Sequence, residues 1–419
     1  MKMTKYKLSE LVEVTRGASL SGQFYAEEGK LIRLTLGNFN MNGGGFKENT
    51  SKTDLYFTGT VRDEFILNEG DIITPLTEQS LGLLGTTARI PESGKYIQSQ
   101  DVALVRCKKG LLDPNFCYYL ISSSIVRQQL SAAAQQTKIR HTSPEKIKDC
   151  TVWVPDFDVQ KNIGRILTDI DNKIAINRQI NDNLEAMAKQ LYDYWLVQFD
   201  FPNEEGKPYK SSGGAMVWNE KLKRKIPQGW SNGVLSDVAN ITMGQSPDGS
   251  SYNEDGEGII FYQGSTDFGL RFPDIRQYTT SPSRYANKGD ILMSVRAPVG
   301  ALNIANNDCC IGRGLSALSS KIGSMTHLYY LMNDFRLKFE GMNSAGTTFG
   351  SITKDELFSL PVIIPTKSVI LEFEQVCEPI FDKQMIIGEE INALTKQLNE
   401  LSPLLMNGQA TVNYHLSAC

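Results

Sequence analysis

The chain has 419 residues, of which 41% are hydrophobic and 21% are charged, and its formal net charge is −4. This length predicts two to three globular domains whose cores need neither disulfides nor metals, and the composition is that of an ordinary globular protein. The polar start of the chain, and the lack of any apolar run near the roughly 20 residues that span a bilayer, argue against a secretory signal and a membrane segment.

Strand and helix signals alternate along the chain. Short β-prone runs bounded by turn residues lie at Asp71–Thr74, Val102–Arg106, Asp290–Val295 and Leu360–Ile364. Shorter helices are expected over 114–135 and 325–340, and long helical segments over 158–197 and 368–407. This mixture predicts an α+β fold.

The chain also contains an internal duplication. Three blocks match in order: Leu8-Ser9-Glu10-Leu11 with Leu235-Ser236-Asp237-Val238, Asn68–Ile72 with Asn287–Ile291, and Thr137–Pro155 with Thr347–Pro365. Gly17 and Gly244 follow the first block at a matching distance. The period is about half the chain, so the repeated unit is a whole globular domain followed by one long helix, and not a solenoid repeat.

The two long segments carry an apolar pattern with heptad spacing. The positions that we label a hold Ile163, Ile170, Asn177, Leu184 and Leu191 in the first segment, and Phe373, Ile380, Ile387, Leu394 and Leu401 in the second. The d positions hold Ile166, Lys173, Ile180, Met187 and Tyr194 in the first segment and are mixed in the second. Such a pattern is typical of a coiled coil, although a heptad stripe also arises from plain packing.

Two matching helices in one chain most simply pair with each other in antiparallel orientation. A buried Asn177 would then help to fix their register. Pro379 predicts a short helix before it and a main helix after it, which ends near Asn407-Gly408. We therefore place the domain boundaries as follows: a first domain at 1–157, a central helix at 158–199, a linker at 200–229, a second domain at 230–367, a distal helix at 368–407 and a tail at 408–419.

The sequence offers no convincing catalytic constellation. It has no nucleotide-binding GxxxxGK[ST] loop, no strand-linked GxGxxG and no [ND]PP[YF] signature of an adenine methyltransferase. The three histidines, His141, His327 and His415, stand alone without metal-ligand spacing. The seven cysteines are scattered without CxxC spacing, so we expect reduced thiols in a cytoplasmic protein. We expect no catalytic residue, no metal and no cofactor in this chain.

Several local segments resemble the specificity subunits of type I restriction–modification systems, and the resemblance covers essentially the whole chain. In the second half they are Gly244-Gln-Ser-Pro247, Lys288–Leu292, Val295–Gly300, Ile311–Gly314 and Thr347–Ile352. Ile163–Trp195 looks like the central spacer of that family. Each segment is weak alone, but their order and duplication are fairly specific.

This resemblance implies a non-catalytic DNA-recognition subunit with a bipartite, asymmetric double-stranded DNA site. Each domain would read one half-site, and the helices would hold two modification subunits, which carry S-adenosylmethionine. A restriction and translocase subunit would complete the complex. The charge distribution agrees with DNA binding by the domains and not by the helices. Residues 158–200 carry five basic and seven acidic side chains, and residues 367–419 carry three and seven, whereas the two domains are neutral to slightly basic.

The candidate DNA contacts are polar side chains in expected turns. They are Thr15, Arg16, Asn38, Lys138, Arg140 and His141 in the first domain, and Thr242, Gln245, Ser246, Arg296, Arg313, Thr348 and Lys354 in the second. Arginine, lysine, asparagine and glutamine are the side chains that read base edges and hold phosphates. For each of them the competing interpretation is a surface or structural role. The basic run Lys221–Lys225 is more simply solvated surface than a DNA contact.

Two other functions stay open at this point. One is a recognition subunit of a related modification-only defence system, which only the neighbouring genes would distinguish. The other is a structural scaffold that assembles through its helices without binding DNA. The modest charge of the domains favours the scaffold slightly, whereas the different variable stretches of the two domains favour DNA recognition.

Overall fold

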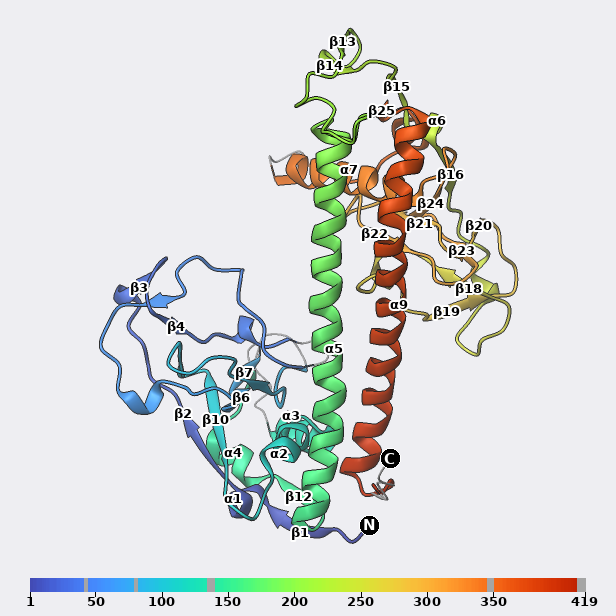
Figure 1. Ribbon diagram of the computed structural model, residues 1–419. Helices are drawn as coiled ribbons and strands as arrows, with labels where there is room; N and C mark the ends of the chain where they lie inside the picture. The colour runs from blue at the N-terminus through green and yellow to red at the C-terminus, as the bar shows by residue number, and fades with distance from the viewer. Residues whose placement is uncertain (41–43, 79–81, 134–139, 345–349, 413–419) are drawn as a thin grey trace, which may run out of the picture. The chain divides into compact units, whose positions relative to one another are not determined.

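The computed structural model describes residues 1–40, 44–78, 82–133, 140–344 and 350–412 of the chain (Figure 1). The chain folds into two compact units. Unit 1 consists of residues 1–175 and 393–419, and unit 2 consists of residues 176–392. Each unit therefore contains one globular domain and parts of both long helices.

Unit 1 is built around two main sheets, each of four strands. The first has the order β2-β10-β6-β8, with β2 (Val12–Arg16), β10 (Val102–Cys107), β6 (Ile72–Pro75) and β8 (Ala88–Arg89). The second has the order β3-β5-β4-β9, with β3 (Tyr25–Ala26), β5 (Tyr56–Phe57), β4 (Leu31–Arg33) and β9 (Tyr96–Ile97). Two-stranded pairs join β1 (Thr4–Lys7) to β12 (Thr151–Val154), and β7 (Thr77–Glu78) to β11 (Arg140–His141).

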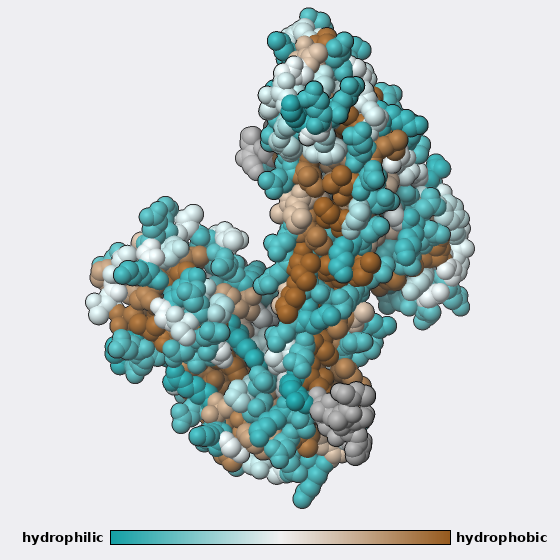
Figure 2. Space-filling view, viewed as in Figure 1, coloured by the Kyte–Doolittle hydropathy of each residue, from teal (hydrophilic) through white to brown (hydrophobic). Residues whose placement is uncertain are grey.

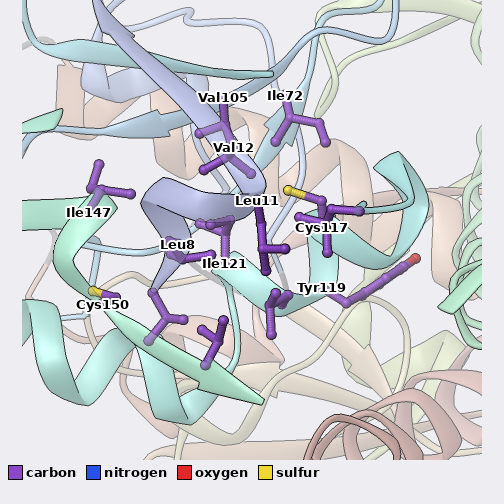
Figure 3. Packing of buried hydrophobic residues seen from close by; sticks show 14 of the residues in the cluster. Leu8, Leu11, Val12, Ile72, Val105, Cys117, Tyr119, Ile121, Ile147 and Cys150 are labelled. Carbon is purple, nitrogen blue, oxygen red and sulfur yellow. The ribbon is translucent and has the colours of Figure 1, made fainter. Parts of the chain in front are cut away.

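Short helices cover the first sheet of unit 1 and complete its core. They are α1 (Leu8–Leu11), α2 (Pro114–Ile121), α3 (Ser124–Ala133) and α4 (Pro144–Asp149). Figure 3 shows Leu11, Val12 and Ile121 pointing toward one another from α1, β2 and α2. Leu8, Phe116 and Val152 in this cluster are fully buried, so the hydrophobic effect stabilises the attachment of the helices to the sheet.

Unit 2 repeats the order of both main sheets and adds one edge strand, β20, to the second. Its first main sheet has the order β16-β24-β21-β22, with β16 (Ala239–Met243), β24 (Leu315–Ser320), β21 (Ile291–Ser294) and β22 (Leu302–Ile304). Its second has the order β17-β19-β18-β23-β20, with β17 (Tyr252–Asn253), β19 (Gln277–Thr279), β18 (Ile259–Tyr262), β23 (Cys309–Ile311) and β20 (Tyr285–Ala286). The pair β15 (Ser231–Val234) and β25 (Pro361–Ile364) matches β1 and β12.

The helices of unit 2 are α6 (Leu235–Val238), α7 (Met325–Ser344) and α8 (Lys354–Phe358). The adjacent pair Tyr118-Tyr119 in α2 has its counterpart in Tyr329-Tyr330 of α7. The sequence-based prediction of a mixed α+β fold with two pseudo-repeat domains is therefore confirmed. The duplication seen in short sequence blocks extends to the strand order of both main sheets, apart from the added edge strand β20 in unit 2.

The two long helices are α5 (Phe157–Tyr192) and α9 (Lys367–Met406), and they pack against each other. In unit 2, Asn177 donates a hydrogen bond to Glu390 (2.9 Å) and Gln384 donates one to Glu185 (2.8 Å), so the residue numbers run in opposite directions. This confirms the expected antiparallel pairing. In unit 1, Ile163 and Leu167 belong to the same core cluster as Leu405.

The buried stripe of α5 differs from the predicted one. Residues at the predicted a positions are buried or half-buried, but Ile180, Met187 and Tyr194 at the d positions are exposed. The second buried row is Leu167, Ile174, Asn181, Ala188 and Trp195, four residues after each a position. The prediction of the d row was wrong because spacings of three and of four residues both fit a heptad, and only the position of the partner helix decides between them.

The expected interruption at Pro379 was also wrong, since α9 runs through it as one helix of 40 residues. Proline removes one amide donor, so the carbonyl of Gln375 loses its helical partner. Pro379 and Gln375 are both exposed, and water can satisfy that carbonyl.

The segment between α5 and β15 is an ordered structure of its own. Strands β13 (Met216–Asn219) and β14 (Arg224–Pro227) form a hairpin that carries most of the basic run. Phe201 stacks on Trp230, with ring centroids 5.2 Å apart, and fixes the start of the segment on unit 2. Within the described ranges, no helix combines the length and the hydropathy needed to cross a bilayer.

Candidate nucleic-acid interface

Each domain contains one parallel pair among its named strands. The pair is β4–β9 in unit 1 and β18–β23 in unit 2, and all other strand pairs are antiparallel. Since parallel strands end at the same edge of a sheet, the loops that follow them lie together. In both domains these loops, with the loop after β2 or β16, enclose a polar surface pocket.

The pocket of the second domain has a volume of about 240 Å³. Three residues predicted as DNA contacts, Ser246, Arg296 and Arg313, line it together. The other lining residues are Gln263, Gly264, Ser265, Thr266, Ser294, Ala297 and Gly314. The structure thus brings residues from four separate loops to one point.

Close contact between backbones holds these loops in place. A Cβ atom on Gly244 would lie 2.2 Å from the carbonyl oxygen of Gly312, so only glycine fits there. The Gly244 amide donates to the carbonyl of Leu315 (2.9 Å), and the Arg313 amide donates to Oγ of Ser246 (3.3 Å). The loop after β16 is thereby fixed to the loop after β23.

The two arginine side chains of the pocket are exposed and available. Arg296 is held through its backbone, because it forms a bridge with Ser351 and its carbonyl accepts a hydrogen bond from Oγ of Ser294 (2.7 Å). Within the part of the chain that the structure describes, neither the Arg296 nor the Arg313 guanidinium forms an ion pair or a hydrogen bond. A guanidinium held in this way can donate two parallel bonds to a guanine edge or a phosphate.

The other predicted contacts of the second domain lie near the pocket or apart from it. Gln245 is exposed and follows Gly244 directly, whereas Thr242 is half-buried within β16. Lys354 is exposed at the start of α8 and lies over the ring of Phe358 (5.2 Å). Thr348 lies outside the described residues. Beyond the pocket, hydrogen bonds from Ser250 lower the pKa of Asp248, so this carboxylate stays ionised.

The pocket of the first domain has a volume of about 320 Å³ and different chemistry. Its lining includes Arg33, Thr35, Asn49, Ser51, Lys52, Ser99, Gln100 and Asp101. Arg33 is buried, donates to Oδ1 of Asp54 (3.0 Å) and lies over the ring of Tyr25 (3.8 Å). Lys52 is exposed and Asp101 is acidic, so this pocket presents less available positive charge than the second one.

Two predicted contacts of the first domain have side chains that are bonded within the fold. Asn38 is 2% exposed, and its side chain accepts from the Thr35 amide (2.9 Å) and donates to the Lys47 carbonyl (3.2 Å). Arg140 pairs with the buried Glu78 (3.2 Å) and donates to the Ser131 carbonyl (2.7 Å). Both side chains satisfy buried polar groups, which would be costly to leave unpaired.

Three other predicted contacts of this domain are exposed. Thr15 and Arg16 end β2, and Nε of Arg16 donates to the carbonyl of Gln100 (2.8 Å) at the rim of the pocket. His141 lies on β11 opposite Thr77. Lys138 lies outside the described residues.

The sequence analysis missed the pocket residues of the loops after β4 and β18. These are Thr35, Asn49, Ser51 and Lys52 in the first domain and Gln263, Ser265 and Thr266 in the second. A signal existed, because both loops contain several polar residues and follow an apolar strand. It pointed to a pocket only once the parallel pairing of that strand was known.

The described residues contain no group of three potential metal ligands among histidine, cysteine, aspartate and glutamate. Among the histidines, His327 is buried in α7, and this burial lowers its pKa to about 4. His415 lies outside the described ranges. The described cysteines carry free thiols.

Comparison with known proteins agrees with this architecture. The model of the type I restriction modification DNA specificity domain matches residues 1–186 and 227–401. The chain is 30% identical over 384 residues to the putative type I restriction enzyme MjaX specificity subunit of Methanocaldococcus jannaschii, covering 86% of this chain and 85% of that one. It is 20% identical to the HindI specificity subunit of Haemophilus influenzae, covering 75% and 81%.

A crystal structure of the type I S subunit from M. genitalium shares the fold, with a TM-score of 0.60 over 97% of this chain and 96% of that one, at 17% identity. The family model covers most of both halves of the chain, including both domains and most of both long helices. The chain therefore belongs to the DNA specificity subunits of type I restriction–modification systems, a family whose members recognise DNA and are not themselves catalytic.

Proposed function

We propose that this subunit reads an asymmetric, bipartite double-stranded DNA site, with one half-site for each domain. One observation carries the proposal. Two domains with the same strand order place a polar pocket at the same topological position, after the parallel strand pair, and line it with different residues. Two unlike half-sites require different base-contacting side chains, and here the two sets are held on the same sheet scaffold.

The chemistry of the second pocket supports direct reading of bases. Arg296 and Arg313 offer guanidinium groups that suit guanine, and Gln263 offers an amide that suits adenine. Ser246, Ser265 and Thr266 add hydroxyl groups that accept or donate. In the first domain, Arg16, Lys52 and Asn49 are the side chains that we assign to the other half-site.

The exposed apolar row of α5 supports a second role, the docking of methyltransferase subunits. Ile176, Ile180 and Met187 are 52%, 39% and 54% exposed although they are large and apolar. Figure 2 shows apolar side chains following this stretch of α5 in unit 2. A long apolar stripe on a helix is the surface that helices of a partner cover.

The rest of the complex follows from this assignment. Two modification subunits would bind, each carrying S-adenosylmethionine and flipping its target adenine, and a restriction and translocase subunit would add the motor and the nuclease. We propose that the complex acts on DNA in the cytoplasm. The domain limits expected from the sequence, 1–157 and 230–367, are our proposal for the two half-site readers.

The proposal is tested by sequencing methylated adenines in cells that express this chain with its neighbouring modification gene. We expect one bipartite motif, and we expect it to disappear when this chain is deleted. Replacing residues 230–367 with the same region of another family member should change only one half of the motif. An unchanged methylation pattern after deletion, with the modification gene expressed, would contradict DNA recognition and favour a scaffold without DNA.

Docking is tested separately by co-purification with the modification subunit. Met187→Glu, alone or with Ile180→Lys, should weaken complex formation at least tenfold, because it places charge on an apolar contact. Gln179→Glu is the control, since Gln179 is exposed and already polar and lies about 100° around the same helix from Ile180, outside the apolar row. Equal weakening by the control would show that added charge, and not loss of the apolar row, is responsible.

A further inference from the structure

A loop of the second domain reaches away from the pocket and onto the helix pair of its own unit. It is the segment Phe268–Pro273, which lies between β18 and β19 and is closed by a bridge between those two residues. Leu270 at its tip is 61% exposed, but its neighbours Arg271 and Phe272 are 6% and 2% exposed. A loop that buries an arginine and a phenylalanine side by side is anchored there.

Arg271 enters a polar socket between α5, α7 and α9. Its Nη2 donates to Oε1 of Gln384 (3.2 Å), and its Nη1 lies 3.8 Å from Oε2 of Glu185. The same Glu185 oxygen accepts hydrogen bonds from Nε2 of Gln384 (2.8 Å) and from the Tyr330 hydroxyl (3.3 Å). A buried guanidinium is costly without an anionic partner, so the loop is held in the arrangement that keeps Glu185 in reach.

Aromatic rings and a glycine complete the socket. The Arg271 guanidinium lies over Phe381 (4.8 Å) and Tyr329 (5.5 Å), where the ring faces attract a cation. Phe272 packs against Gly388 of α9, where a Cβ atom would lie 2.7 Å from the Phe272 ring. Both anchors thus fit α9 within little more than one helical turn, at positions 384 and 388.

The anchor is connected to the pocket over a very short path. Gln263 and Thr266 line the pocket, and only four residues separate Thr266 from Arg271. The intervening backbone is tied down, since Asp267 accepts from the Gln263 amide (2.9 Å) and its carbonyl accepts from the Asp274 amide (2.7 Å). Any movement of the anchor therefore moves the pocket wall.

Unit 1 has no such anchor in its described residues. The corresponding loop is closed by a bridge between Phe39 and Phe46, and its described tip residues Gly44 and Gly45 have no side chain to insert. The face of Tyr118, the counterpart of Tyr329, is covered instead by Arg89 from β8 (4.7 Å). Among the described residues, a buried arginine and phenylalanine inserted side by side in this way occur in the second domain and not in the first.

We propose that Arg271 and Phe272 are positioning residues that latch the base-reading loop of the second domain to the helix pair. The inference rests on the proposed function, and it assigns these two side chains to accuracy at one half-site. Without the latch, the pocket wall at Gln263–Thr266 no longer has one fixed orientation toward the DNA. The second half-site is then read less selectively, while the first half-site is read as before.

The test uses the full complex with its modification subunits and three variants: Arg271→Met, Arg271→Lys and Leu270→Ala. Binding is measured to the cognate duplex and to duplexes with one base changed in either half-site. For Arg271→Met, the preference for the cognate second half-site should fall about tenfold, the size of one lost base discrimination. The preference at the first half-site should stay unchanged. Arg271→Lys should recover most of the loss, and the neighbouring Leu270→Ala should behave as wild type.

Three outcomes would contradict the proposal. The first is that both preferences stay unchanged in Arg271→Met, and the second is that both fall together. The third is that Arg271→Met and Arg271→Lys both fail to fold and assemble, which would indicate a purely structural role. Thermal unfolding and co-purification of each variant distinguish the last case. Failure of the proposed function is recognised separately, because the wild-type complex would then show no preference at either half-site.

Discussion

The two domains have one frame and two surfaces. Their main sheets have the same strand order apart from the added edge strand β20, and the same close backbone approach recurs after β2 and β16, where Cβ atoms on Gly17 and Gly244 would each lie 2.2 Å from a carbonyl oxygen. The loops after the parallel strands differ in length, charge and anchoring. The comparison teaches that the same sheet arrangement can carry loops of different charge and anchoring, because its stability resides in the sheets and in a few glycines.

The difference in available charge is larger than the sequences suggest. Both domains contain arginines, but in the first domain the pocket residue Arg33 is paired with Asp54, and Arg140, which does not line the pocket, is paired with the buried Glu78. In the second domain Arg296 and Arg313 have no such partner among the described residues. Counting arginines in the sequence alone therefore overestimates the positive charge that the first domain can offer to DNA.

The largest effect on DNA binding is expected from removing the two available arginines of the second domain. The double variant Arg296→Ala with Arg313→Ala should lose roughly 1000-fold in affinity for cognate DNA, about 4 kcal/mol, because each bidentate contact contributes about 1–3 kcal/mol. Arg16→Ala in the first domain should cost only a few-fold, since Arg16 also donates to the Gln100 carbonyl. Binding of the assembled complex is measured at several salt concentrations.

The salt dependence separates two ways in which the arginines act. If they read bases, the slope of affinity against salt stays near the wild-type value and specificity at the second half-site drops. If they hold phosphates, the slope falls by about two and specificity is retained. Equal effects of the double variant and Arg16→Ala would contradict the difference in available charge between the domains.

The next effect tests the shared frame. Gly17→Ala and Gly244→Ala should each destabilise the protein by about 3 kcal/mol, because the added Cβ atom collides with a backbone carbonyl that cannot move aside. Gly22→Ala and Gly249→Ala are matched controls five residues further on, where a Cβ atom meets at most an ordinary contact. Thermal unfolding is the measurement, and normal stability of either Gly17→Ala or Gly244→Ala would mean that the two domains do not share this constraint.

These glycines also show how far the sequence alone could predict the fold and the site. Repeated blocks located both domains, the strands at Ile72 and Ile291 and both long helices, because backbone constraints such as Gly17 and Gly244 leave a trace in any sequence. Burial of polar residues leaves no such trace, so the structural bonds of Asn38 and Arg140 were not foreseen. Arg271 was missed for the same reason, since nothing in the segment Gly-Leu-Arg-Phe-Pro indicates that its arginine is buried against the helix pair.

A smaller effect, on the free energy of unfolding, distinguishes the two domains when the pH is lowered. His327 of α7 occupies the place that Phe116 has in α2, and burial lowers its pKa to about 4. Between pH 7 and pH 5 the unfolded chain takes up a proton on His327 near its ordinary pKa of about 6.5, whereas the folded chain does not. Stability therefore falls with falling pH, by about 2 kcal/mol at pH 5. His327→Phe, which copies unit 1, should remove this part of the acid sensitivity.

The control for this experiment is His141→Gln, because His141 is exposed and its replacement should leave the pH profile unchanged. Urea unfolding at pH 7 and at pH 5 gives the comparison. If His327→Phe loses as much stability as the wild type between these two pH values, burial of His327 is not the cause of the acid sensitivity.

The smallest effects are expected in the helix pair, where the two units differ in polarity. The part in unit 1 is apolar, with Leu167 and Leu405 buried, whereas the part in unit 2 contains buried Asn177 and Asn181. Asn177 donates to Glu390, but Oδ1 of Asn181 has no hydrogen-bond partner among the described residues. Asn177→Leu should therefore destabilise by about 1 kcal/mol, because Glu390 loses a donor, while Asn181→Leu should be neutral or slightly stabilising. Urea unfolding of both variants decides this, and an equal loss in both would show that the polar stripe of unit 2 acts as a whole and not through the single bond of Asn177.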